Sequence, residues 1–383
     1  MAIVCLGFSV KLRLSPAGTC RLVQAHLPAR LRPLCASMKS MHAVVLEQPG
    51  RLCPLDLADA APPRPGEALV RIRRVGICGT DLRAFKGIQP YFSYPRILGH
   101  ELSGVIEQVE PDNPFGLRPG DRCAIEPYLH CGDCAACRRG RTNCCERLQV
   151  LGVHADGGMR EFLPVPLAKL HKSAQLSFDQ LALVEMLSIG AHAARRASLQ
   201  PDDRALILGA GPIGLATLVF ARLAGLDPLV MDVDPARLDF CRQALAARTL
   251  RIDSPPAAGS PPAGLREACG GELPTIVFDC TGNPQSMRGA FDDVAHGGRL
   301  VFVGLTLESI SFQDPLFHAR EISLLASRNA TAEDFRQVLL ALESGRLRPE
   351  LWITHRATHR AVAEEFPRWI AGGPNFRKAL VEW

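Results

Sequence analysis

Hydrophobic positions divide the chain into a β-rich first half and an alternating second half. From Ala43 to about Val109, short strand-like runs such as ALVRIRRVGICG and LSGVIEQVE are separated by glycine and proline. This punctuation is typical of a small all-β body with long loops. Beyond Leu187, the buried-strand patterns RALIL, PLVMDVD, TIVFDCTG and GGRLVFVGL alternate with segments of helical period. That alternation predicts an α/β domain with a parallel sheet.

Two further segments complete the pattern. The stretch from Asp253 to Gly264, DSPPAAGSPPAG, is rich in proline and glycine and is predicted to be a surface loop. Beyond Ser327, the segment AEDFRQVLLALESG has the period of an amphipathic helix, and short strands are expected to follow it. At 383 residues, the chain is long enough for about two domains of roughly 150 residues each.

The first 40 residues differ in charge from the rest of the chain. The net charge is +5, and much of the excess comes from this segment, which contains no acidic residue. Its cations are Lys11, Arg13, Arg21, Arg30, Arg32 and Lys39. Arg-rich, acid-poor segments are typical of organelle transit peptides; alternatively, the segment precedes the true start of the enzyme at Met41. In both cases we expect residues 1–40 to lie outside the fold.

The remaining composition narrows the class of protein. Hydrophobic residues make up 47% and charged residues 22% of the chain, as in ordinary globular enzymes. No apolar run approaches the roughly 18 residues that a membrane span needs. The near-neutral body gives no case for a nucleic-acid partner. We therefore expect an enzyme with a small-molecule substrate.

Five of the 14 cysteines lie between residues 131 and 145. Clustered cysteines in an intracellular enzyme indicate metal binding rather than disulfides, which predicts a reducing, cytoplasmic location unless residues 1–40 direct import. Thiolates with this spacing can surround one zinc ion tetrahedrally and leave no open position, so we expect a structural site. Its ligands would be Cys131, Cys134, Cys137 and Cys145. An iron–sulfur cluster and unliganded buried thiols are the alternatives, and Cys144 is left over.

A second metal set is dispersed along the chain. Cys78-Gly79-Thr80-Asp81 follows one predicted strand, and Gly99-His100-Glu101 precedes another. Taken alone, His100 would be read as a satisfied structural histidine. A thiolate, an imidazole and a carboxylate together suit a zinc ion that keeps an exchangeable position.

The third motif is the glycine-rich stretch Gly209-Ala210-Gly211-Pro212-Ile213-Gly214. It follows a strand, opens a helix and is followed 18 residues later by Asp232 at the end of the next strand. That context is typical of dinucleotide binding, with the pyrophosphate at the helix N-terminus and the acid on the ribose hydroxyls. Asp232 would repel a 2′-phosphate, which favours NAD over NADP, although Arg237 could accept that phosphate.

These three motifs, in this order, resemble those of the zinc-containing medium-chain dehydrogenases, and the resemblance covers Met41 to the C-terminus. It implies an α/β fold in which a GroES-like catalytic domain is split around a Rossmann domain. The implied limits are 41–187 for the catalytic domain, 188–326 for the Rossmann domain and 327–383 for the return to the catalytic domain. It also implies two zinc ions per chain, NAD, and a homodimer or homotetramer.

The resemblance also assigns roles to individual residues. Catalytic zinc falls to Cys78, His100 and Glu101, with Glu185 as a further carboxylate that reaches the metal directly or through water. Thr80 would carry the substrate proton outward, Asp81 would orient His100, and the nicotinamide would lie near Gly304.

Two positions depart from the family pattern. The polyol-type enzymes usually have Glu-Pro where this chain has Glu185-Met186. Many relatives carry a histidine that ends the proton relay five residues after the zinc cysteine, where this chain has Arg83. Arginine cannot shuttle protons at neutral pH. Either water finishes the relay, or Arg83 binds an anionic group.

Within the family, four stretches are similar to the L-galactonate and L-gulonate 5-dehydrogenase group: GIQPYFSYPRILGHE, GRTNCCE, GVHADGG and SRNATAEDF. Those enzymes oxidise a secondary hydroxyl of a sugar acid. A carboxylate substrate would give Arg83, Arg96 or Arg328 a bidentate partner, although each could instead form an ordinary salt bridge. The alternatives are a polyol, a neutral sugar or L-threonine as substrate, and a non-catalytic relative.

Overall fold

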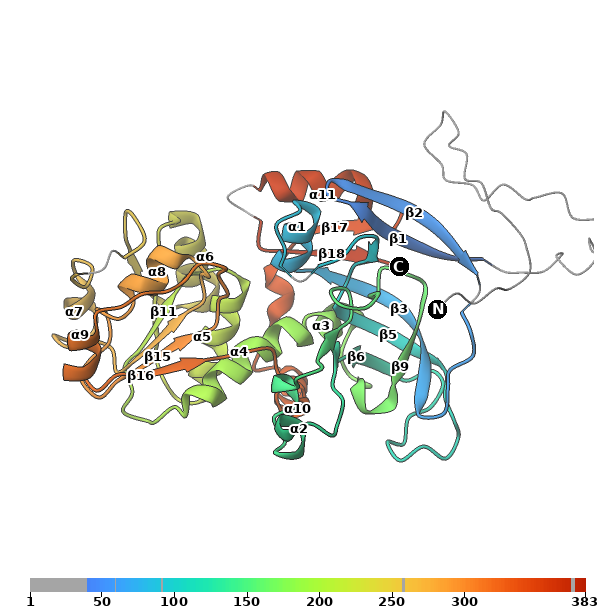
Figure 1. Ribbon diagram of the computed structural model, residues 1–383, viewed down its shortest axis with the longest axis horizontal. Coiled ribbons are helices and arrows are strands. Elements are labelled where there is room, and N and C mark those ends of the chain that lie inside the picture. The colour runs from blue at the N-terminus through green and yellow to red at the C-terminus, as the bar shows by residue number, and fades with distance from the viewer. Residues whose placement is uncertain (1–39, 59, 91, 257–258, 373–375) are drawn as a thin grey trace, which may run out of the picture.

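The protein consists of a β-rich body and an α/β body, which lie at opposite sides of Figure 1. This computed structural model describes residues 40–58, 60–90, 92–256, 259–372 and 376–383. The basic segment predicted over residues 1–40 therefore lies outside the described residues, except for Ser40 at the start of β1.

Antiparallel pairing dominates the β-rich body. A three-stranded sheet has the order β2-β1-β4, and a seven-stranded sheet has the order β10-β6-β5-β3-β18-β17 with β9 also paired to β3. These strands are β1 (Ser40–Gln48), β2 (Arg51–Ala58), β3 (Glu67–Ile77), β4 (Arg96–Ile97), β5 (Glu101–Gln108), β6 (Arg122–Ile125), β9 (Phe162–Pro166), β10 (Leu170–Lys172), β17 (Ile353–Thr358) and β18 (Lys378–Glu382). A separate two-stranded sheet pairs β7 (Tyr128–Leu129) with β8 (Gln149–Val150).

The register of three central strands brings distant residues together. β3 pairs antiparallel with β5, so that Gly76 lies opposite Glu101. β3 also pairs antiparallel with β18, so that Ile77 lies opposite Ala379. The residues that follow β3, the residues that precede β5 and the start of the last strand therefore meet at one edge of this sheet.

The α/β body contains a six-stranded parallel sheet with the order β13-β12-β11-β14-β15-β16. β11 and β14 are buried along their full length, as expected for strands that are covered on both faces. The strands are β11 (Ala205–Leu208), β12 (Leu229–Asp232), β13 (Arg248–Arg251), β14 (Ile276–Asp279), β15 (Arg299–Phe302) and β16 (Ser323–Ala326). The predicted parallel sheet is thus confirmed.

Helices begin where the sequence supplies caps. Asp234 accepts hydrogen bonds from Ala236 N and Arg237 N at the start of one helix, and proline follows it. The helices are α1 (Gly79–Phe85), α2 (Ala135–Arg138), α3 (Phe178–Ala182), α4 (Val184–Ala197), α5 (Pro212–Leu223), α6 (Pro235–Leu245), α7 (Leu265–Ala268), α8 (Pro284–Gly289), α9 (Asp314–Ala319), α10 (Ala332–Glu343) and α11 (Val362–Ala371). In the described part of the chain, no helix is long and apolar enough to cross a membrane.

Two helices connect the bodies. α4 leads into the α/β body, α10 leads out of it, and the two pack against each other. α4 runs through the predicted domain limit at 187/188, whereas β16 ends at Ala326, next to the predicted limit at 326/327. The amphipathic helix and the short strands predicted for the tail are present. α11 was not predicted.

Candidate functional site

Three side chains from the first dispersed motif meet at the edge of the large sheet. One atom each from Cys78, His100 and Glu101 can be chosen so that all lie within 4.8 Å of one another. Cys78 follows β3, and His100 precedes β5, whose first residue is Glu101. Gly76 makes room for the carboxylate, because a Cβ there would lie 2.1 Å from Glu101 Oε2. The strand pairing alone therefore brings together the predicted ligands of the catalytic zinc.

The charges around this set suit a divalent cation. Burial lowers the pKa of His100, but the negative charges of Asp81 and Cys78 outweigh it and hold that pKa well above its usual value. The environment that would retain a proton on the imidazole also attracts a metal ion, and metal binding replaces the proton. Thiolate, imidazole and carboxylate are all zinc ligands. The residues present therefore fit a zinc ion.

Asp81 occupies the predicted position beside His100. It is fully buried in α1, and its Oδ2 accepts a hydrogen bond of 2.9 Å from Cys78 N. Its Oδ1 lies 3.7 Å from His100 Nδ1, and neither atom has another hydrogen-bond partner among the described residues. The separation is too long for a direct hydrogen bond. Asp81 thus interacts with the imidazole only through its charge, and its one direct hydrogen bond among these residues is to the backbone of Cys78.

Lys378 is a residue that the sequence analysis missed. Its Nζ lies 2.7 and 2.8 Å from the two carboxylate oxygens of Glu101 and donates to Ile77 O at 3.2 Å. The ammonium group therefore neutralises Glu101 and links it to the end of β3. Nothing in the local sequence indicates this contact, because the two partners are 277 residues apart.

Glu185 lies near Cys78, His100 and Glu101 but is not one of the three residues whose ligand atoms cluster together. It is buried in the first turn of α4 and accepts a hydrogen bond from the hydroxyl of Tyr128. Burial raises the pKa of Glu185 to about 7, against the opposing positive charge of His100. Its role as a further zinc ligand remains a prediction, and Tyr128 is a second residue that the sequence analysis missed.

Thr80, the expected proton carrier, and Arg83, which stands in place of the usual relay histidine, both lie on α1. Thr80 is half-buried at the second position of the helix, and Arg83 is exposed in its last turn. The guanidinium of Arg83 has no hydrogen-bond or ion-pair partner among the residues that the structure describes.

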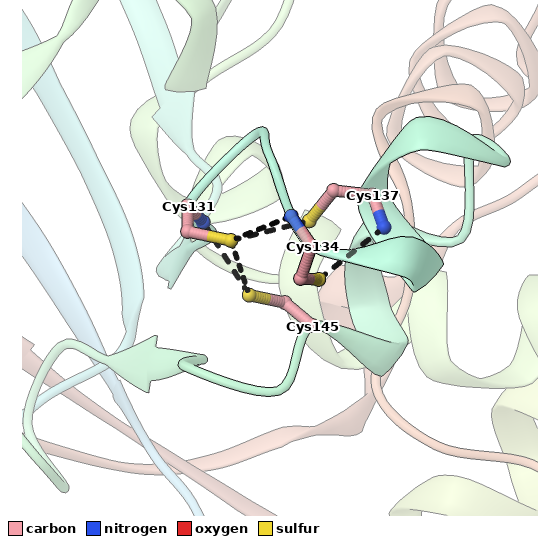
Figure 2. Close-up of side chains that lie close together, drawn as sticks. All are labelled: Cys131, Cys134, Cys137 and Cys145. Carbon is pink, nitrogen blue, oxygen red and sulfur yellow. Dashed lines mark hydrogen bonds between the residues drawn. The ribbon is translucent and has the colours of Figure 1, made fainter.

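The four cysteines of the predicted structural site converge on one point (Figure 2). Cys131 Sγ lies 3.4 Å from Cys145 Sγ and 3.9 Å from Cys137 Sγ, which is too far for disulfide bonds. Four thiolates at the Zn–S distance of about 2.3 Å are roughly 3.8 Å apart. Backbone N–H groups of Glu146 and Cys137 lower the pKa of Cys134 to about 6. The geometry suits a single zinc ion, and the adjacent Cys144 is exposed.

A groove lies over the carboxyl ends of neighbouring parallel strands, where α/β sheets bind nucleotides. Gly209 after β11, Asp232 at the end of β12 and Thr281 after β14 line it. Pro255 and Pro256 also line it, so part of the predicted surface loop contributes to the groove.

The glycine-rich motif forms the turn between β11 and α5. Gly211 caps the helix, Pro212 occupies its first position, and Ile213 and Gly214 follow. A Cβ on Gly214 would lie 1.8 Å from Gly209 O, so only glycine allows the helix to approach the strand this closely.

Asp232 is fixed by the backbone around it. Its Oδ2 accepts from Ala210 N at 2.6 Å, and its Oδ1 accepts from Asp234 N at 2.9 Å. The remaining lone pairs of the carboxylate can accept from ribose hydroxyls. Arg237 also lines the groove and pairs with Asp234 at 3.5 Å. Gly304 donates its backbone N–H to Asp279 O.

Arg96 stands four residues before His100 and already has partners. Its guanidinium contacts Asp156 Oδ1 at 3.3 Å and Ser93 Oγ at 2.8 Å. Asp156 belongs to the loop 151–158, which follows β8 and hydrogen-bonds to the backbone of residues 97–99. This loop therefore lies against the residues that precede His100.

Arg328 lacks such a partner. Its guanidinium is exposed on the crossover 327–331 between β16 and α10, and it forms no hydrogen bond or ion pair with the described residues. Burial lowers the pKa of His154, and the positive charges of Arg328 and Arg96 lower it further. Two of the three predicted substrate arginines, Arg96 and Arg328, thus act on the same loop from different elements.

Comparisons with known proteins agree with this geometry. Residues 64–175 match the alcohol dehydrogenase GroES-like domain, and residues 212–344 match the zinc-binding dehydrogenase family. The chain is 39% identical over 344 residues to L-galactonate-5-dehydrogenase of Escherichia coli K12, which covers 90% of this chain and 99% of that protein.

Two solved structures have the same fold. One is the alcohol dehydrogenase RspB of Escherichia coli CFT073 complexed with NADH, with a TM-score of 0.80, 29% identity and coverage of 90% of this chain and 99% of that chain. Another is a zinc-binding dehydrogenase of Sinorhizobium meliloti 1021 bound to NADP, with a TM-score of 0.79, 26% identity and coverage of 90% and 100%. With two zinc-compatible sites and a dinucleotide groove on this fold, the chain belongs to the zinc-dependent medium-chain alcohol dehydrogenases, enzymes that use a nicotinamide cofactor.

Proposed function

We propose that this enzyme oxidises a secondary hydroxyl of a sugar acid of the L-galactonate or L-gulonate type and transfers the hydride to NAD. The observation that carries the substrate assignment is the unpartnered guanidinium of Arg328. Its charge acts, like that of Arg96, on His154 in the loop 151–158, which hydrogen-bonds to the backbone of residues 97–99 just before His100. Guanidinium groups bind carboxylates bidentately. A substrate carboxylate supplies the counter-ion that the described residues do not give Arg328.

The three candidate arginines differ in their availability. Asp156 neutralises much of the charge of Arg96. Arg96 therefore shapes the substrate site more than it binds the substrate carboxylate. Arg83 is free but lies at the far end of α1 from Cys78. We therefore assign the carboxylate to Arg328. The similarity to L-galactonate-5-dehydrogenase supports the same substrate class.

The chain supplies the geometry of the reaction. Zinc held by Cys78, His100 and Glu101 would supply Lewis acidity at the substrate hydroxyl. Lys378 keeps Glu101 in place, and Thr80 offers the hydroxyl that takes the substrate proton towards water. We assign the end of this route to water, because Arg83 cannot accept a proton.

Asp232 supports NAD as the preferred cofactor. Its buried carboxylate is fixed at the wall of the groove, where a 2′-phosphate would meet a like charge. Arg237 is the residue that would favour NADP, but its partner Asp234 offsets its charge.

The substrate assignment is tested by NADH formation with L-galactonate, L-gulonate, sorbitol, L-fucose and L-threonine under the same conditions. We expect a preference for the sugar acids that a zinc chelator abolishes. L-Gulonate and sorbitol are a matched pair, since sorbitol carries a hydroxymethyl group where L-gulonate carries the carboxylate. Equal or better activity on sorbitol, L-fucose or L-threonine would reject the carboxylate assignment and leave the family unchanged.

We also propose that two copies associate through the α/β body. β16 is the edge strand of its sheet, and Leu324 on it is 39% exposed. Leu305 and Leu307, near the end of β15, are exposed as well. An apolar edge strand favours pairing with another chain. Light scattering should give at least a dimer, and Leu324→Lys should shift it towards the monomer.

The free thiols of the described cysteines support a cytoplasmic location.

A further inference from the structure

Asn143 lies in the loop that carries the four clustered cysteines, but its side-chain amide contacts residues outside that loop. It is in the 3-10 turn Thr142–Cys144, between the predicted ligands Cys137 and Cys145, and is 3% exposed. Its Nδ2 donates to the backbone oxygen of Arg328 at 2.8 Å. A turn of the metal lobe therefore holds the backbone of the residue to which we assign the substrate carboxylate.

The amide also contacts α4. Asn143 Nδ2 lies 3.1 Å from His192 Nε2, so its two hydrogens serve the carbonyl oxygen and the imidazole. Because a carbonyl oxygen only accepts, the orientation with Nδ2 towards Arg328 is the one that both contacts permit. His192 Nε2 is then the acceptor, and the imidazole proton lies on Nδ1.

A buried carboxylate completes the network. His192 Nδ1 lies 2.9 Å from Asp334 Oδ2, and Arg195 donates to Asp334 Oδ1 at 2.8 Å. Burial raises the pKa of Asp334, but the hydrogen bonds from His192 and Arg195 outweigh it and hold that pKa well below its usual value. Asp334 also accepts from Thr331 N and so closes the N-terminus of α10. The network thus joins the metal lobe, α4 and both ends of the crossover 327–331.

We propose that Asn143 is a positioning residue, through which the fold of the structural-metal lobe sets the place of the Arg328 guanidinium at the substrate. This inference rests on the proposed function, in which Arg328 binds the carboxylate. The cysteine lobe then has a second role: it supports substrate selectivity as well as the fold. A residue that only stabilised the lobe would change stability and leave the discrimination between acid and polyol unaltered.

The test uses Asn143→Leu, which removes both donors at similar volume, Arg328→Gln, and the double variant. The measurements are KM for L-gulonate and for sorbitol, the dissociation constant of L-gulonate from the NADH-bound protein, and zinc content. We expect each single variant to raise KM and the dissociation constant for L-gulonate by about fivefold or more, with sorbitol changed less than about twofold. In the double variant, Asn143→Leu should add less than about twofold, because coupled residues are not additive.

Asn113→Leu is the matched control. Asn113 is also buried and donates to two backbone oxygens, those of Glu110 and Leu117, but it lies in another loop of the β-rich body. It should lower stability without changing the gulonate-to-sorbitol ratio. If Asn143→Leu does not fold with two zinc ions, Asp334→Asn replaces it, because it weakens the hold on His192 and Arg195 with little change in volume.

The outcomes separate this inference from the proposed function. In one outcome, Arg328→Gln changes the gulonate-to-sorbitol ratio, whereas Asn143→Leu behaves like the Asn113 control. This outcome would overturn the positioning role and keep the carboxylate assignment. Additive effects in the double variant would overturn it as well. If Arg328→Gln leaves the gulonate-to-sorbitol ratio unchanged, the carboxylate assignment fails and the positioning role fails with it.

Discussion

Lys378 and Glu101 form a buried ion pair in which one ammonium nitrogen contacts both carboxylate oxygens, at 2.7 and 2.8 Å. The side chains are 3% and 1% exposed. The ammonium group gives this buried carboxylate a counter-ion, and its orientation is set by the last strand of the chain. The last strand of the chain thus supports a predicted metal ligand that lies 277 residues earlier in the sequence.

Lys378→Met should weaken the catalytic zinc site. Removing one partner leaves the Glu101 charge buried and unpaired, which costs about 3–5 kcal/mol in comparable pairs. Loss of a residue that orients a metal ligand typically lowers metal affinity or activity by about 10- to 100-fold. Zinc content and kcat/KM measure both effects.

Lys169→Met is the matched control for that variant. Lys169 also pairs with a buried carboxylate, Glu126, which is not a predicted metal ligand. We expect it to lower the melting temperature while one zinc ion remains at each site. Equal loss of zinc in both variants would show that the Lys378 effect is not specific to the site.

Removing one thiolate from each cluster should separate the two zinc ions. Cys78→Ser should lose about one zinc per chain and all turnover while still binding NAD, because the groove lies in the other body. Cys134→Ser should lose the other zinc and much of the thermal stability, because structural zinc orders a lobe with little core of its own. Metal analysis measures the zinc content of each variant, and calorimetry measures its thermal stability. Near-normal turnover in Cys78→Ser would reject the catalytic assignment.

Asp232→Ser should shift cofactor preference towards NADP. The change removes the like charge that opposes a 2′-phosphate and the acceptor for Ala210 N. Since hydrogen bonds to charged groups contribute about 1.5–3 kcal/mol, we expect kcat/KM with NAD to fall about 10- to 100-fold. Arg237→Ala in the same background should reverse any gain with NADP. An unchanged ratio of the two cofactors in Asp232→Ser would contradict this role.

Asp293→Asn should stabilise the protein, increasingly so as pH rises. Burial and the neighbouring charge of Asp292 raise the pKa of Asp293 to about 8, and its oxygens have no hydrogen-bond partner among the described residues. Between the unfolded value of about 3.9 and pH 8, the folded state binds more protons, so stability falls through this window. The neutral amide removes that loss. We expect the melting temperature to rise by about 3 °C or more at pH 8 and by less at pH 5.

Asp292→Asn is the control for the pH effect. Asp292 is buried nearby but accepts a hydrogen bond from Gly259 N at 2.8 Å, so its ionised form has a partner. It should gain less stability at pH 8 than Asp293→Asn, because it relieves only the repulsion between the two carboxylates and leaves the burial of Asp293 unchanged. Equal gains in both variants would point to a general relief of negative charge in this region.

Local patterns determined the features that depend on neighbours in the sequence. The spacing of Cys131, Cys134, Cys137 and Cys145 sufficed to predict their cluster, because short spacing on one loop leaves few other arrangements. The glycine-rich turn was predictable for the same reason, since its strand, turn and helix are contiguous. The tail showed the limit of this approach: α10 had a clear helical period, whereas α11 contains Pro367 and was missed.

Contacts between distant segments were decided only by the tertiary structure. The sequence alone named Cys78, His100 and Glu101 as ligands, but it did not reveal Lys378, whose contact depends on the pairing of β18 with β3. In the same way, no local pattern connects Asn143 with Arg328, which meet because α4 and α10 bring the crossover against the metal lobe. The sequence determines chemistry and local geometry through short-range sterics, whereas burial of the whole chain selects which distant charges and hydrogen-bonding groups must satisfy one another.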